Sequence, residues 1–129
     1  MKLETERHGD LLLVRVQEPR LDAALAIRFK DALRALAAEG TPRVLLDLEQ
    51  VGFLDSSGLG ALVAVMKYLQ PARTLELACL SPGVERVFAL THMGRVFTVH
   101  ETVAAARAGG SEADTAPAAP QSDPGPAPA

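Results

Sequence analysis

The residues best suited to chemistry stand in one run, Asp55-Ser56-Ser57-Gly58-Leu59-Gly60. Asp and Ser are ordinary caps at the start of a helix, because their side-chain oxygens accept hydrogen bonds from the first N–H groups. Three candidate caps in a row exceed what one helix end needs. The two glycines also leave the backbone open to another molecule. The run therefore predicts a serine that is modified or contacted, with helix capping as the competing interpretation.

Several enzymatic interpretations fit this run badly. It lacks the third glycine of a dinucleotide-binding loop, no Gly-Lys-Ser/Thr follows, and the nucleophile-elbow pattern of serine hydrolases is absent. The histidines, His8, His92 and His100, are predicted to be surface or boundary residues. The single cysteine, Cys79, excludes a disulfide within the chain and a metal site with several cysteines. We therefore expect no enzymatic activity, no metal and no cofactor.

Strand and helix patterns alternate along the chain and must position this run. The patterns predict strands at residues 2–8, 11–16, 43–48, 74–80 and 95–99 and helices at about 22–38, 55–69, 82–94 and 101–108. Asp22 and Ser81 are predicted helix caps, and Pro82 fits the first turn of the third helix. The order predicts an α/β fold with a mixed, mainly parallel sheet of about five strands packed by about four helices.

The serine run follows a strand whose apolar residues, at 44–46 and 48, suit a central position covered on both faces. Parallel strands place their carboxyl ends at one edge of the sheet, where ligands and partners of open α/β sheets tend to bind. Three loops should share this edge, carrying Asp22, Ser56 and Ser81. The topology alone thus predicts that these residues lie near one another.

Composition sets further expectations. The chain has 129 residues, of which 48% are hydrophobic, which suits one domain with its own core. All 13 Lys and Arg lie at or before Arg107, whereas three of the 16 acids follow it, so the net charge of −3 belongs to the C-terminal residues. We predict a folded domain over residues 1–109 and a disordered tail over 110–129, which is rich in Ala and Pro.

Composition and apolar patterning also indicate where the protein is located and which partners it does not bind. No basic stripe of the kind found in nucleic-acid-binding proteins is visible. The N-terminal residues form no apolar signal segment, and the apolar runs fall short of the roughly 20 residues that cross a bilayer. We therefore expect a cytoplasmic protein, a monomer, without direct binding to nucleic acid and without membrane insertion.

The stretch from Leu46 to Gly60 resembles the signature of bacterial anti-sigma factor antagonists of the STAS family. Leu21-Asp22 before the first helix and the run from Leu80 to Val84 are also similar to that family. The resemblance covers about residues 2–108. Family members often carry Gly-Glu-Leu-Asp before the first helix, where this chain has Glu18-Pro19-Arg20-Leu21-Asp22 and only the last two residues match.

The resemblance implies a partner-switching phosphoprotein. In its unphosphorylated form it would bind an anti-sigma factor that is also a serine kinase. This binding would release a sigma factor. The kinase would phosphorylate Ser56 and abolish binding, and a PP2C-like phosphatase would reverse the modification. Ser57 is expected to be a second cap. The expected partner-binding residues are Asp22, Asp55, Ser56, Ser57, Gly58, Leu59, Gly60, Ser81 and Pro82. The alternative is a STAS adaptor subunit of another signalling or transport complex, which docks without a phosphorylation cycle.

Overall fold

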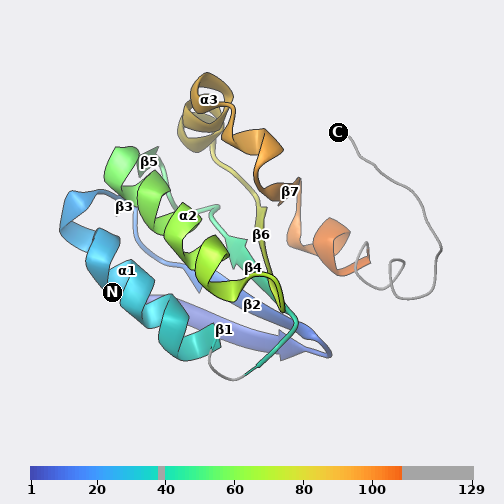
Figure 1. The fold of residues 1–129 in the computed structure, drawn as a ribbon. Coiled ribbons are helices and arrows are strands. Elements are labelled where there is room, and N and C mark those ends of the chain that lie inside the picture. The colour runs from blue at the N-terminus through green and yellow to red at the C-terminus, as the bar shows by residue number, and fades with distance from the viewer. Residues whose placement is uncertain (38–39, 109–129) are drawn as a thin grey trace.

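A five-stranded sheet forms the centre of the molecule, with strand order β1-β2-β4-β6-β7 (Figure 1). A computed structural model of the chain describes residues 1–37 and 40–108. The strands β2, β4, β6 and β7 run parallel to one another, and β1 pairs with β2 in the antiparallel sense. The strands span Leu3–His8 (β1), Leu11–Val16 (β2), Arg43–Asp47 (β4), Thr74–Ala78 (β6) and Thr98–His100 (β7).

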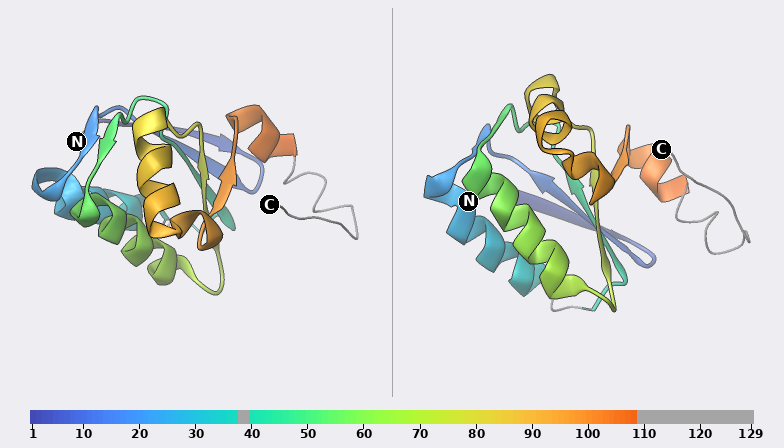
Figure 2. Two further views of the ribbon diagram at one scale, coloured as in Figure 1. Left: turned by 90° about the horizontal axis from the view of Figure 1, so that it is seen from above. Right: turned by 45° about the horizontal axis from the view of Figure 1, so that its top comes forward.

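The helices lie on both faces of this sheet. They are α1 (Ala23–Ala37), α2 (Ser56–Leu69), α3 (Pro82–Thr91), the short 3-10 helix η1 (Met93–Arg95) and a last helical segment at residues 103–108. Figure 2 shows α1, α2 and α3 on one side of the sheet and the segment 103–108 on the other. The predicted α/β class, with its mainly parallel five-stranded sheet and four helices, is confirmed.

Aliphatic side chains hold the layers together. The larger core lies between the sheet and the three long helices and includes Val14, Leu46 and Leu77 from the strands and Phe29 and Leu62 from the helices, all with no exposed surface. The smaller core lies on the opposite face, where Ala106 packs against Leu11, Leu13 and Leu45. Because β2 and β4 are covered on both faces, their sequences are runs of apolar residues.

The structure departs from the predicted elements mainly at three places. Two strands of two residues each, β3 (Arg20–Leu21) and β5 (Phe53–Leu54), pair in parallel as a separate small sheet that the sequence did not indicate. The last strand occupies 98–100 instead of 95–99, because η1 takes up residues 93–95. The third helix ends at Thr91, where His92 adopts a left-handed conformation with φ of 59°. The predicted tail, 110–129, lies outside the described residues.

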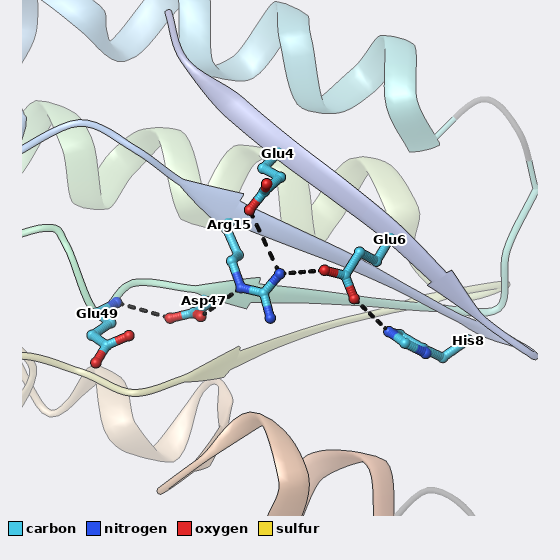
Figure 3. Close-up of polar contacts among 6 residues, drawn as sticks. All are labelled: Glu4, Glu6, His8, Arg15, Asp47 and Glu49. Atoms are coloured by element: carbon cyan, nitrogen blue, oxygen red, sulfur yellow. Dashed lines mark hydrogen bonds and ion pairs between the residues drawn. The ribbon is translucent and has the colours of Figure 1, made fainter.

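A group of charged residues lies on the sheet face opposite α1 and α2, on β1, β2 and the end of β4 (Figure 3). The guanidinium of Arg15 lies 2.5 Å from a carboxylate oxygen of Glu6, 3.6 Å from one of Glu4 and 3.5 Å from one of Asp47. The hydrogen bond from Arg15 lowers the pKa of Glu6, with a further contribution from His8. Glu4 and Glu6 are exposed, so we assign their pairs with Arg15 little stability, whereas Asp47 is buried.

A second polar group is centred on the buried Glu76 and connects the sheet to the segment 103–108. Glu76 is 7% exposed and accepts hydrogen bonds from Arg43 at 2.6 and 2.7 Å and from His100 at 2.8 Å. Arg43 also donates to the carbonyl oxygen of Ala106 at 3.0 Å. Burial opposes the charge of Glu76, but the bonds and charges of Arg43 and His100 outweigh it and lower its pKa to about 2. The ion pair therefore anchors the last helical segment.

None of the helices in residues 1–37 and 40–108 has both the length and the apolar character needed to cross a membrane.

Candidate functional site

The candidate site is the sheet edge where three loops meet. These loops follow β2, β4 and β6 and comprise residues 17–22, 48–55 and 79–81, with β3 and β5 inside the first two. The amides of Gly52 and Phe53 donate to the carbonyl oxygen of Pro19 at 2.9 and 3.3 Å. The hydroxyl of Ser81 donates to the carbonyl oxygen of Val51 at 2.6 Å. The predicted meeting of the loops that carry Asp22, Ser56 and Ser81 is therefore confirmed.

Ser56 is the first residue of α2 and is exposed. The helix cap is Asp55, whose carboxylate accepts a hydrogen bond from the amide of Gly58 at 3.0 Å. The prediction that Ser57 acts as a second cap is wrong, because Ser57 lies inside the helix at its second position and is exposed. Asp55 thus accounts for the capping, and both serine hydroxyls stand at a helix start whose N–H groups have no acceptor within the helix.

Gly58 and Gly60 have different surroundings. A Cβ on Gly58 would collide with the carbonyl oxygen of Leu21 and lie 2.8 Å from the side chain of Leu54. Gly58 is buried, so the expectation that it opens the backbone to another molecule is wrong: it lets α2 lie directly against β3. A Cβ on Gly60 would meet nothing within 4 Å, and the backbone there is exposed. The predicted openness holds for Gly60 alone.

Asp22 and Ser81 fix the other two helix starts at this edge. The carboxylate of Asp22 accepts from the amide of Ala24 at 3.1 Å, which caps α1. The hydroxyl of Ser81 accepts from the amide of Val84 at 3.4 Å, with Pro82 at the first position of α3. Both predicted caps are confirmed. Since Ser81 also donates to the loop before α2, it ties α3 to the segment that carries Ser56.

Two residues at this edge carry a contact that sequence reasoning missed. The guanidinium carbon of Arg20 lies 4.4 Å from the centre of the Phe53 ring, and the two residues are paired across β3 and β5. They are distant in sequence, and no motif links them. Only the pairing of two very short strands brings them together.

Cys79 lies at the start of the third loop with an unusual φ of 61°. Its thiol is partly buried and packs against the smaller core. Burial raises the pKa of this thiol, and the nearby Asp47 carboxylate adds to the effect. A raised pKa keeps the thiol protonated, which makes it a poor nucleophile.

Comparison with known proteins agrees with this architecture. Residues 2–106 match the family model described as STAS domain. An anti-sigma-B factor antagonist of Staphylococcus epidermidis is 30% identical over 102 residues, which cover 78% of this chain and 94% of that protein. The match is nearly full-length for the relative. The chain therefore belongs to the STAS domain family.

Solved structures support the same fold. The crystal structure of an anti-sigma factor antagonist from Mycobacterium paratuberculosis superposes with a TM-score of 0.76 at 26% identity, covering 84% of this chain and 92% of that chain. The Bacillus cell fate determinant SpoIIAA, in its phosphorylated form, has a TM-score of 0.62 at 21% identity, covering 83% of this chain and 97% of that chain.

Proposed function

We propose that this protein is an anti-sigma factor antagonist controlled by phosphorylation of Ser56. The unphosphorylated form binds an anti-sigma factor that is also a serine kinase, and this binding releases a sigma factor. The kinase phosphorylates Ser56, and a PP2C-like phosphatase restores the free hydroxyl. The protein acts by binding, as a monomer in the cytoplasm, and catalyses no reaction itself. Domain 1–109 carries the function, with the tail at 110–129 outside it.

The observation that carries the proposal is the position of Ser56. Its hydroxyl is exposed at the first position of α2, one residue after the Asp55 cap. The start of a helix bears unpaired N–H groups and a partial positive charge, so it tolerates a phosphate. Phosphorylation can therefore change the surface without unfolding the domain.

A phosphate on Ser56 has a larger effect on the binding of the partner than on the fold of the domain. A phosphate adds a charge of about −1.5 to −2 at neutral pH. If an anionic group of the partner faces it at about 7 Å, the repulsion is roughly 2–5 kcal/mol at an effective dielectric constant of about 20. This weakens binding by about two or three decades, since each 1.4 kcal/mol is about tenfold. Charge and bulk at one serine are enough for a switch.

The proposed contact surface extends from Ser56 over the edge of the sheet. It includes Asp22, Asp55, Ser56, Ser57, Leu59, Gly60, Ser81 and Pro82, and Gly58 contributes from beneath by seating α2 against β3. Asp22, Asp55 and Ser81 fix three helix starts. The surface is therefore held in one arrangement before a partner arrives, which limits the entropy lost on binding.

Binding measurements test this proposal. The unphosphorylated wild type, the Ser56→Ala variant and the Ser56→Asp variant are each titrated with purified anti-sigma factor kinases encoded in the same genome. The proposal expects Ser56→Ala to bind like the wild type and Ser56→Asp to bind at least about tenfold more weakly. Equal affinities of the two variants would contradict a charge mechanism. Failure of the wild type to bind any of these kinases would contradict the proposed function.

A further inference from the structure

An exposed cation and an aromatic ring form a second feature of the sheet edge. Arg20 of β3 and Phe53 of β5 are register partners in the small parallel sheet, and the guanidinium stacks over the ring. Phe53 is one of the exposed large apolar residues, at 41% exposed. The side chain of Arg20 is 59% exposed and lies 3.4 Å from Asp22. Arg and aromatic residues are the types that dominate the energy of protein interfaces.

This pair has a fixed position relative to Ser56. Phe53 and Leu54 form β5, and the chain passes through Asp55 directly into α2. The amide of Asp55 donates to the carbonyl oxygen of Leu21 at 3.3 Å, and Leu21 follows Arg20 in β3. The pair and the serine therefore belong to one rigid unit. A partner that docks on the start of α2 has the pair beside it.

The loops around the Arg20–Phe53 pair carry more acidic than basic residues. In the three loops at residues 17–22, 48–55 and 79–81, Arg20 is the single basic residue, whereas Glu18, Asp22, Glu49 and Asp55 are acidic. The Nε of Arg20 is paired with Asp22, and its terminal nitrogens are the donors left for a partner. A carboxylate of a partner would be repelled over most of these loops and attracted only at these terminal nitrogens. Such a lone opposite charge fixes the register of docking and rejects partners that lack the matching group.

We propose that the Arg20–Phe53 pair is the specificity-determining contact for the anti-sigma factor kinase and that it receives an Asp or Glu side chain of that kinase. The two terminal nitrogens of the planar guanidinium present two parallel donors to a carboxylate. The bond from Nε to Asp22 and the stacking on Phe53 hold the group in place before docking. The exposed ring gives the partner an apolar surface next to the charge. This inference rests on the proposed function, because it assigns the partner to the same edge.

Affinity measurements on the full chain test the inference. Wild type, Arg20→Glu, Arg20→Lys, Phe53→Leu and Arg107→Glu are titrated with the same purified kinases, after circular dichroism has established that each variant is folded. Arg107 is the matched control, because it is an exposed arginine on the helical segment 103–108, far from β3 and β5 (Figure 2). We expect Arg20→Glu to weaken binding by about 10- to 100-fold. Arg20→Lys and Phe53→Leu should each weaken it by about threefold to tenfold.

Two further measurements identify the partner group. The loss caused by Arg20→Glu should shrink as salt rises, because salt screens the new repulsion. Replacing single Asp and Glu residues of the kinase by Arg should yield one change that restores binding to Arg20→Glu. Binding of Arg20→Glu within twofold of the wild type, a loss equal to that of Arg107→Glu, or the lack of any restoring change would overturn the inference. If the wild type binds none of the kinases, the proposed function itself fails.

Discussion

The α-carbon of Gly58 lies so close to the carbonyl oxygen of Leu21 that no side chain fits between them. This contact places the first turn of α2 directly against β3. It also sets the position of Ser56, which lies two residues earlier on the same turn. The glycine in the serine run therefore serves the packing of the start of α2, and the exposed residues around Ser56 depend on that packing.

Substitution of Gly58 by Ala should destabilise the protein. Ala is the better helix former, but its Cβ would meet backbone atoms that cannot move without shifting β3. We expect a loss of about 1–3 kcal/mol in the free energy of unfolding. Gly60→Ala is the matched control in the same helix, because its Cβ meets open space. That variant should gain about 0.5–1 kcal/mol. Urea unfolding measures both, and a change of the same sign in the two variants would contradict the contact.

Removal of the Ser81 hydroxyl should also cost stability. Ser81→Ala loses the cap of α3 and leaves the carbonyl oxygen of Val51 without its donor, which lies at 2.6 Å in the wild type. We expect a loss of about 1–2 kcal/mol in the free energy of unfolding. Ser57→Ala changes an exposed hydroxyl in the helix and should stay within about 0.5 kcal/mol of the wild type. Equal stabilities of the two variants in urea unfolding would speak against the role assigned to Ser81.

The buried ion pair of Glu76 predicts a specific dependence of stability on pH. The pKa of Glu76 falls from an ordinary value of 4.5 to about 2 in the folded protein. Because the folded value is the lower one, the ionised carboxylate stabilises the fold above about pH 4.5 and loses this effect as the pH falls toward 2. The contribution reaches about 3 kcal/mol.

Comparison of the wild type with Glu76→Gln isolates this contribution. The free energies of unfolding of the two proteins should differ most above pH 5, and the difference should shrink steadily down to about pH 2. A difference that stays constant over this range would show that Glu76 has an ordinary pKa in the folded protein.

The sheet, the helix starts and the shared edge could be predicted from the sequence because they follow from strong local patterns. Long apolar runs predict the buried strands β2, β4 and β6, and Asp22 and Ser81 stand where caps are expected. The parallel topology then brings the three loops together. These features depend on residues that are close in sequence or on a general rule of strand connection.

The remaining features depend on contacts between distant segments. The strands β3 and β5 have two residues each, too few for any periodic pattern, and each exists through pairing with the other. The role of Gly58 depends on Leu21, which no local rule connects to it. The same holds for Arg43, Glu76 and His100, three polar residues whose mutual contacts are visible only in the folded chain.

Mapping of the phosphorylated residue tests the central claim most directly. Wild type, Ser56→Ala and Ser57→Ala are incubated with the anti-sigma factor kinase and ATP, and the modified position is determined by mass spectrometry. The expected result is one phosphate per chain on Ser56 in the wild type, the same modification in Ser57→Ala, and none in Ser56→Ala. Phosphorylation that persists in Ser56→Ala, or disappears in Ser57→Ala, would contradict the assignment of Ser56 as the switch.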